Sequence, residues 1–230
     1  MPALNQKNNP RRAVLKHFTA LTTLLAMNGL CIAAASAAEA VTTPKRLTLL
    51  VVGDSLSAEY GLPRGSGWVA LLEKQLVLEK RPALVVNASI SGDTTSGGRS
   101  RLAALLRQHR PTHVVLELGA NDALRGLPLG MTQTNLGEMA RASKAAGASV
   151  VVVGMQMPPN YGRKYAEDFN KLFAAVAKSE NAALVPFLLK GVADVPGAEA
   201  LFQADRIHPN ARAHPTMFSN VWAVLKPLLG

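Results

Sequence analysis

The chain has 230 residues, of which 48% are hydrophobic, and this length and composition suit one globular domain with a sizeable core. Lys and Arg outnumber Asp and Glu by 25 to 15, which gives a formal net charge of +10. The basic residues are scattered, without a dense run or interleaved aromatic residues, and this pattern argues against a nucleic-acid-binding protein. A basic surface does suit anionic substrates or contact with a membrane surface.

Residues 1–40 have the pattern of an export signal. A polar, basic stretch over residues 1–17 precedes an apolar run over residues 18–35, and small-x-small triplets then end at Ala37 and Ala40. We therefore expect a signal peptide over residues 1–40, cleaved after Ala37 or Ala40, and a single domain over residues 41–230 that is periplasmic or secreted. A permanent membrane anchor fits less well, because the apolar run is short and contains threonines.

Two details of this leader bear on the export route and on redox chemistry. Residues 10–16 resemble the Arg-Arg-x-x-Leu-Lys pattern of twin-arginine signals, and a general secretory signal with two arginines is the open alternative. The only cysteine, Cys31, follows Leu30 at a place where a lipoprotein signal carries a small residue, so no lipid anchor is expected. Without residues 1–40 the chain has no cysteine, which excludes disulfides and thiolate metal sites there.

A buried strand is predicted over residues 47–52, which are mostly apolar and run directly into Gly53, Asp54 and Ser55. Gly53 tolerates the backbone angles of a sharp turn. Ser55 thus follows the carboxyl end of the first parallel strand, at the edge where open α/β sheets bind ligands, and is a candidate nucleophile. On this stretch alone, an equally good interpretation is that Asp54 and Ser55 form a turn and cap the next helix.

Helices and strands alternate through the rest of the chain. Apolar residues at helical spacing predict helices over residues 68–80, 98–109, 132–146 and 165–179, and a last helix from Pro215. Short apolar runs predict strands over residues 83–86, 112–118, 149–153 and 183–187. Short crossovers of this kind demand parallel strands with helices on both faces. We expect an α/β fold, a three-layer α/β/α flavodoxin-like sandwich with a five-stranded parallel sheet in the order 2-1-3-4-5.

This topology brings distant polar residues to one edge of the sheet. The loops after strands one, two, three and five carry Ser55, Gly92, Asn121 and the pair Asp205 and His208. Acyl ester hydrolysis needs a nucleophile, a base, a group that orients the base, and donors for the oxyanion. Ser55, His208 and Asp205 can fill the first three roles. The backbone N–H groups of Ser55 and Gly92 and the side-chain amide of Asn121 can be the donors.

Each of these residues also has a purely structural interpretation. Gly92 can be a turn glycine, Asn121 can cap its loop, and Asp205 can bond a nearby backbone N–H. His214 follows the turn of His208 and is not expected in the site. No cluster has metal-ligand spacing, and neither Gly-x-Gly-x-x-Gly nor Gly-x-Ser-x-Gly occurs, so we expect no metal, no cofactor and no α/β-hydrolase elbow.

Four sequence blocks in order resemble the signature of the SGNH, or GDSL, hydrolases. They are Gly53-Asp54-Ser55-Leu56-Ser57, then Gly92, then Gly119-Ala120-Asn121-Asp122, then Asp205-x-x-His208-Pro209. The likeness spans about residues 47–229 and is strongest to the family's exported thioesterases, lysophospholipases and arylesterases. It implies a catalytic triad of Ser55, Asp205 and His208, and an oxyanion hole formed by Ser55, Gly92 and Asn121.

The resemblance also implies which loops hold the substrate. In that group the loops that correspond here to residues 123–128 and 157–162 border the acyl groove, which implies substrate contacts from Leu124, Arg125, Gly126, Met157 and Pro158. Two residues depart from the usual pattern. Ala120 replaces a more usual glycine and should alter its turn little. Glu59 stands where a small residue is common, and it should place a carboxylate near the mouth of the site.

The sequence therefore predicts an exported serine esterase that acts, as a monomer, on a small acyl ester or thioester, lysophospholipids included. The apolar loop residues Leu124, Leu127, Met155 and Met157 favour acyl groups of medium or long chain. Two alternatives stay open, a carbohydrate O-acetyl esterase and a non-catalytic lipid-binding protein. The complete catalytic set argues against the second, because a binding protein needs no triad.

Overall fold

A computed structural model describes residues 47–157 and 159–230. The predicted signal peptide, its cleavage sites and the candidate residue Pro158 lie outside the described residues. None of the helices in the described ranges combines the length and the apolar character needed to cross a membrane.

One parallel sheet forms the centre of the fold. Its strands are β1 (Leu47–Gly53), β2 (Ala83–Asn87), β3 (His113–Glu117), β4 (Ser149–Val153) and β5 (Ala183–Val185), and their order is β2-β1-β3-β4-β5. The predicted five-stranded sheet and its strand order are therefore confirmed. The register pairs Gly53 with Glu117, so the loops that follow β1 and β3 begin side by side.

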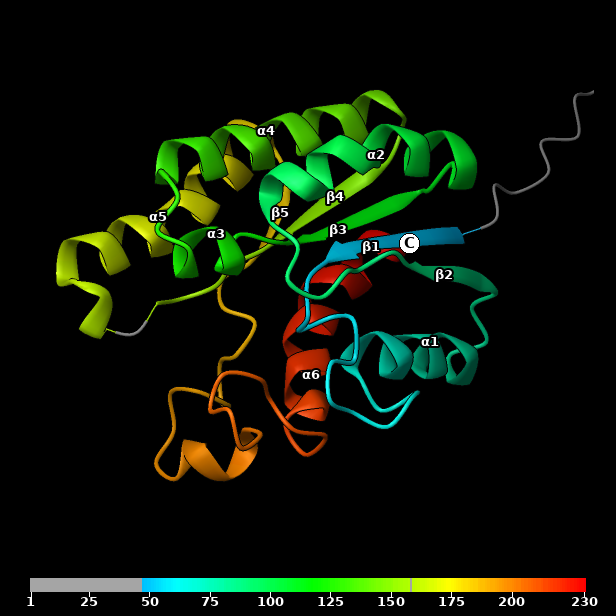
Figure 1. The fold of residues 1–230 in the computed structure, drawn as a ribbon. Helices are drawn as coiled ribbons and strands as arrows, with labels where there is room; N and C mark the ends of the chain where they lie inside the picture. The colour runs from blue at the N-terminus through cyan, green and yellow to red at the C-terminus, as the bar shows by residue number, and fades with distance from the viewer. Residues whose placement is uncertain (1–46, 158) are drawn as a thin grey trace, which may run out of the picture. The chain divides into compact units, whose positions relative to one another are not determined.

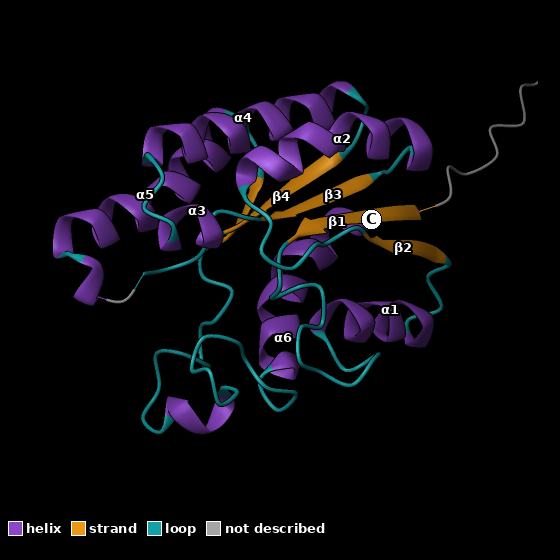
Figure 2. Ribbon diagram, viewed as in Figure 1, coloured by secondary structure: helices purple, strands orange, loops and turns teal. Residues whose placement is uncertain are grey.

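Helices cover both faces of the sheet, as the alternating pattern predicted (Figures 1 and 2). α1 (Trp68–Leu78) and α6 (His214–Leu225) pack together on one face, and α2 (Thr95–His109), α4 (Leu129–Ala145) and α5 (Arg163–Ser179) cover the other. Shorter elements are the helix α3 (Ala120–Leu124) and the 3-10 turns η1 (Pro159–Tyr161), η2 (Ala198–Leu201) and η3 (Lys226–Leu229). The three-layer sandwich is thus confirmed.

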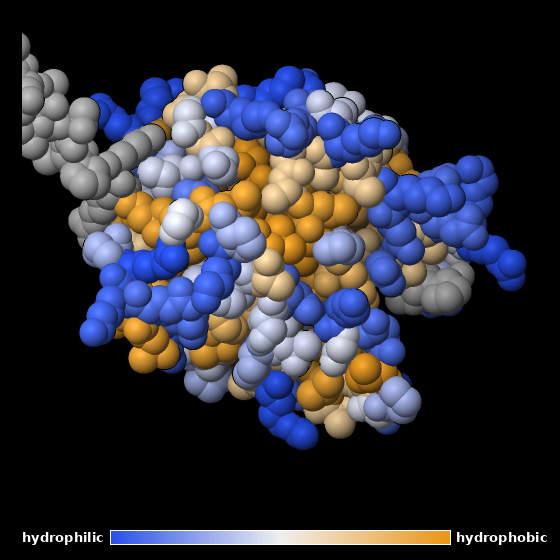
Figure 3. All heavy atoms as spheres, turned by 180° about the vertical axis from the view of Figure 1, so that it is seen from behind, coloured by the Kyte–Doolittle hydropathy of each residue, from blue (hydrophilic) through white to orange (hydrophobic). Residues whose placement is uncertain are grey.

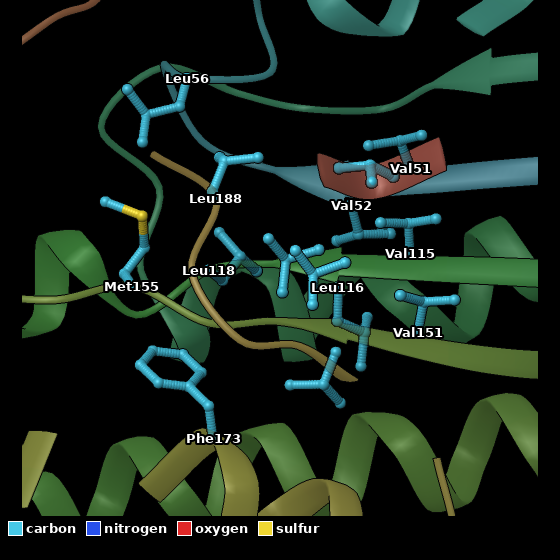
Figure 4. Close-up of a cluster of buried hydrophobic side chains, with 14 of the residues drawn as sticks. Val51, Val52, Leu56, Val115, Leu116, Leu118, Val151, Met155, Phe173 and Leu188 are labelled. Carbon is cyan, nitrogen blue, oxygen red and sulfur yellow. The ribbon is translucent and has the colours of Figure 1, made fainter. Parts of the chain in front are cut away.

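The core lies between the sheet and its helices. Figure 4 shows Val52, Leu116 and Val151 from the three central strands, with Phe173 of α5 below them, and all four side chains are almost fully buried. Burying a side chain of this size stabilises the fold by about 1.5–3 kcal/mol. The surface seen from behind is mixed, with hydrophobic residues gathered near its middle and hydrophilic ones around them (Figure 3).

Several element boundaries differ from the sequence predictions. α2 begins at Thr95 instead of residue 98, because the Thr94 side chain accepts a hydrogen bond from the Gly97 backbone N–H at 3.3 Å and so caps the helix. α4 begins at Leu129 instead of residue 132, directly after Pro128. Residues 120–124, expected to be loop, form α3, and the fifth strand ends at Val185.

Candidate active site

Ser55 follows β1 in a turn that only a glycine at position 53 allows. A Cβ atom on Gly53 would lie 2.8 Å from Glu117 Oε2 and 2.8 Å from Ser57 Oγ, closer than real side chains approach. The absent side chain lets the buried Glu117 carboxyl group reach under the turn. There Glu117 Oε2 accepts hydrogen bonds from Ser57 Oγ at 2.6 Å and from the Asp54 backbone N–H at 3.3 Å. These two hydrogen bonds to Glu117 therefore hold the turn that carries Ser55 in place.

The Asp54 side chain also holds this turn in place, through two hydrogen bonds. Its Oδ1 accepts a hydrogen bond from the Leu56 backbone N–H at 3.0 Å, and its Oδ2 accepts one from Asn121 Nδ2 at 3.0 Å. Only 1% of Asp54 is exposed, and this burial raises the pKa of its carboxyl group to about 6. From the sequence, Asp54 is predicted only to form a turn or to cap a helix.

Glu117, which the sequence does not predict as part of the site, lies under the turn that carries Ser55. Burial, and after it the nearby charge of Asp54, raise the pKa of Glu117 well above its usual range. Its Oε1 is buried and has no hydrogen-bond partner in the described part of the chain. These observations fit a protonated, neutral carboxyl group. The signal in the sequence is an acidic residue that directly follows the apolar run over residues 114–116.

The side chains of Ser55, His208 and Asp205 form a chain of contacts. His208 Nε2 lies 2.9 Å from Ser55 Oγ, and His208 Nδ1 lies 2.7 Å from Asp205 Oδ2. Asp205 Oδ1 accepts hydrogen bonds from the backbone N–H groups of Ile207 at 2.9 Å and His208 at 3.0 Å. The backbone N–H groups of His208 and Ile207, and then the imidazole, lower the pKa of Asp205 to about 2. The structure thus brings Ser55 together with two residues of one turn, although Ser55 and His208 are 153 positions apart in the sequence.

Tyr60 packs against the same imidazole and was not singled out from the sequence. The ring centroids of Tyr60 and His208 lie 4.4 Å apart, with 41° between the ring planes. Gln203 Nε2 donates hydrogen bonds to the backbone carbonyls of Tyr60 at 2.9 Å and Pro209 at 3.1 Å. Gln203 therefore ties the loop after Ser55 to the turn that holds His208.

Each of the three predicted oxyanion donors has a hydrogen atom available for a substrate. In residues 47–157 and 159–230, the backbone N–H groups of Ser55 and Gly92 donate to no other group. Gly92 has a φ of +78°, a conformation that favours glycine. Asn121 uses one amide hydrogen on Asp54 and has a second one free. Ser55 and Asn121 both line one cavity, whereas Gly92 is not among its lining residues.

That cavity has a volume of about 490 Å³ and also reaches His208. Most of its remaining lining residues are apolar: Leu56, Ala120, Leu124, Met155, Met157, Tyr161, Phe187, Leu189, Ala193, Phe202 and Ile207. Two of the predicted substrate contacts, Leu124 and Met157, are therefore in the wall. Arg125 and Gly126 are not, and Arg125 Nη2 instead donates a 2.7 Å hydrogen bond to the Gly92 carbonyl.

The predicted position of the Glu59 carboxylate is wrong. Its oxygens accept hydrogen bonds from the backbone N–H groups of Gly65, at 3.0 Å from each oxygen, and of Gly67 at 2.7 Å. Glu59 does not line the cavity. The reason is local, because the loop over residues 61–67 presents unpaired N–H groups that a carboxylate can satisfy.

His214, which the sequence placed outside the site, is buried under α1. Its Nδ1 accepts a 3.0 Å hydrogen bond from the Trp68 backbone N–H, and burial lowers the pKa of its imidazole. Over the described ranges, no group of three or more His, Cys, Asp or Glu side chains is arranged to hold a metal ion.

The chain is similar to known ester hydrolases over most of its length. The sequence model of the GDSL-like Lipase/Acylhydrolase family matches residues 51–215. The esterase TesA of Pseudomonas aeruginosa is 54% identical over 182 residues, which cover 79% of this chain and 89% of that protein. Thioesterase 1/protease 1/lysophospholipase L1 of Escherichia coli is 41% identical over 182 residues, which cover 79% of this chain and 85% of that protein.

A solved structure is similar in fold as well as in sequence. The crystal structure of the psychrotrophic esterase EstA from Pseudoalteromonas, inhibited by monoethylphosphonate, superimposes with a TM-score of 0.74. It is 42% identical in sequence, and the match covers 79% of this chain and 98% of that one.

Proposed function

The chain belongs to the GDSL-like Lipase/Acylhydrolase family, and from this membership we propose that it is an exported serine esterase for acyl esters and thioesters. The observation that carries the mechanism is the 2.9 Å contact between Ser55 Oγ and His208 Nε2. A serine hydroxyl becomes an effective nucleophile when a neighbouring base accepts its proton.

Ser55 Oγ attacks the acyl carbon while its proton passes to His208 Nε2. Asp205 accepts a hydrogen bond from Nδ1, which fixes the tautomer that leaves Nε2 free and stabilises the imidazolium ion that forms. The low pKa of Asp205, about 2, keeps its carboxylate charged at neutral pH. His208 then returns the proton to the leaving oxygen or sulfur, and the acyl group remains on Ser55.

A water molecule completes the cycle by the same route in reverse. His208 takes its proton, the resulting hydroxide attacks the acyl carbon, and Ser55 leaves with the proton returned by His208. The two tetrahedral intermediates carry a negative oxygen. We assign its stabilisation to the backbone N–H groups of Ser55 and Gly92 and to the free amide hydrogen of Asn121.

The apolar cavity is the proposed acyl-binding groove. Its wall of Leu, Met and Phe side chains supports acyl groups of medium or long chain over an acetyl group. Leu124 and Met157 retain the substrate-binding role implied by the sequence, and Arg125 and Gly126 shape the loop beside Gly92. The basic leader over residues 1–17 and the triplets at Ala37 and Ala40 support export.

The test is hydrolysis of p-nitrophenyl esters from acetyl to palmitoyl by the full chain and by a Ser55→Ala variant. We expect a rate maximum at medium or long chains, and a loss of turnover in Ser55→Ala of at least about 10³-fold. The matched control is Ser149→Ala, because Ser149 is an exposed serine at the opposite end of the sheet. This control should retain full activity.

The other outcomes would each replace the proposal. A serine-dependent maximum at the acetyl ester would make the protein an O-acetyl esterase. Full activity in Ser55→Ala would remove Ser55 from the mechanism. No serine-dependent turnover of any ester, together with no covalent labelling by a fluorophosphonate, would favour the non-catalytic lipid-binding protein.

A further inference from the structure

Arg206 has an unusual backbone conformation beside the proposed catalytic base. Its φ is +57°, in the left-handed region that favours glycine, and its backbone N–H donates a 2.9 Å hydrogen bond to the Gln203 carbonyl. The residue lies in the turn between Asp205 and His208. Its side chain is exposed and lines the cavity.

Other non-glycine residues with positive φ in the described ranges have a local explanation. Lys80, Arg110 and Asn181 lie one or two residues after the ends of the helices α1, α2 and α5, where a left-handed residue is common. Glu59 places its carboxylate on the N–H groups of the loop over residues 61–67. Arg206 ends no helix, and its guanidinium group has no hydrogen-bond or ion-pair partner in the described part of the chain. An unexplained outlier at a site is a reason to look for a functional role.

No carboxylate among the residues that line the cavity neutralises this guanidinium group. Arg206 is the only Lys or Arg among the lining residues, and Asp54 is the only carboxylate. Asp54 is buried and already accepts hydrogen bonds from Leu56 and Asn121. Asp205 is adjacent in sequence, but both of its oxygens bind the backbone or ring of its own turn, and no ion pair joins it to Arg206. The mouth of the cavity therefore offers a free cation.

We propose that Arg206 binds a phosphate group on the leaving-group side of the substrate. This inference rests on the proposed function, because it assigns the leaving group to the side of His208, which protonates it. Arg206 belongs to the same turn as His208. A guanidinium group binds phosphate through two parallel hydrogen bonds, which suits the phosphate of a lysophospholipid head group and the phosphates of coenzyme A alike.

The experiment compares two monomeric esters that differ only in the phosphate, 1-hexanoylglycerol 3-phosphate and 1-hexanoylglycerol. The readout is the ratio of kcat/KM for the phosphorylated ester to that for the neutral ester, measured on the full chain. We expect Arg206→Gly to lower this ratio at least about tenfold, mainly through KM, and Arg206→Lys to lower it less. The wild-type ratio should also fall as salt is added, because exposed charges are screened.

Arg110→Gly is the matched control. Arg110 is also an exposed arginine with a positive φ of 44°, but it ends α2 at the opposite edge of the sheet, so its replacement should leave the ratio unchanged. In both variants glycine relieves the left-handed conformation, so thermal unfolding should show folded proteins with equal or higher stability. A second substrate pair, hexanoyl-CoA and hexanoyl-N-acetylcysteamine, separates the two phosphate sources. If Arg206→Gly lowers the kcat/KM ratio for both substrate pairs, Arg206 binds phosphate groups in general. If it lowers the ratio only for the glycerol phosphate pair, Arg206 binds the phosphate of a lipid head group.

Failure of this inference can be told apart from failure of the proposed function. If Ser55→Ala abolishes hydrolysis but Arg206→Gly leaves the ratio of both substrate pairs unchanged, Arg206 does not bind phosphate and the esterase assignment stands. If hydrolysis of both esters survives in Ser55→Ala, the proposed function itself is wrong. An equal fall of the ratio in Arg110→Gly would also overturn the role of Arg206.

Discussion

The Asp54 carboxylate accepts a hydrogen bond from the Asn121 side chain, with 3.0 Å between Oδ2 and Nδ2. This contact joins the turn after β1 to the start of α3, and it leaves one amide hydrogen of Asn121 free. Asn121 is thereby held at a fixed orientation in the cavity wall. We therefore expect Asn121 to affect catalysis and Asp54 to affect the pH dependence of stability.

Replacing Asn121 by alanine should lower kcat with little change in KM. The lost amide would stabilise the oxyanion, which forms only during the reaction, and loss of one such donor costs about 10²–10³ in kcat. Steady-state kinetics on the best p-nitrophenyl ester measure the change in kcat and KM. A melting curve shows whether the variant is folded. A folded Asn121→Ala protein with unchanged kcat would remove Asn121 from the oxyanion hole.

Asp54→Asn should change how stability depends on pH. The pKa of Asp54 is about 6 in the folded protein against an ordinary value of 3.8, so the folded state holds the proton more tightly. This contribution to stability is complete below pH 4 and is lost as the pH rises through 6. The free energy of unfolding of wild type, relative to Asp54→Asn, should fall by about 2 kcal/mol from pH 4 to pH 7. Denaturant unfolding at a series of pH values measures it, and a constant difference would contradict the raised pKa.

Asp205→Asn should lower kcat by about 10³–10⁴ without unfolding the protein. The asparagine side chain can still accept the backbone hydrogen bonds of the turn, but it no longer stabilises an imidazolium ion. The comparison to make is with Asp194→Asn, an exposed aspartate that binds the Gly191 backbone N–H outside the cavity. Similar activities in the two variants would show that Asp205 only shapes its turn.

Tyr60→Ala should lower kcat about three- to tenfold, since Tyr60 positions the His208 ring by packing against it. Tyr60→Phe keeps this packing and should restore most of the activity. Equal losses in the two variants would point to the hydroxyl group instead of the ring.

Much of the fold followed from patterns that act locally. The apolar runs of β1, β3 and β4 and the helical spacing between them predicted the sheet and its order, because parallel strands with short crossovers allow few arrangements. The edge that gathers Ser55, Asn121 and His208 followed from the same topology. Helix starts were less accurate, since the cap at Thr94 depends on one side-chain rotamer.

The contacts that could not be predicted join side chains from different loops. The direction of Glu59 depends on N–H groups that the loop over residues 61–67 presents only once it is folded. The position of Tyr60 against His208 joins residues that are far apart in the chain. Glu117 was visible as a charge in an apolar strand, but its role required the register that pairs it with Gly53.

The proposed triad residues lie on two segments that differ in how firmly they are packed. Ser55 follows a strand that is buried from residue 48 to residue 53. Asp205 and His208 instead lie in the connection over residues 186–213, whose only regular elements among the described residues are η2 and one bridge between Phe202 and Pro209. Within this connection, residues 193–208 include no buried residue, and such a segment can open without disturbing the sheet. On heating, catalytic activity should therefore vanish at a lower temperature than the helical circular dichroism signal, and brief heating into that interval should be reversible. Heat tolerance of the enzyme is then a property of this one connection and not of the core.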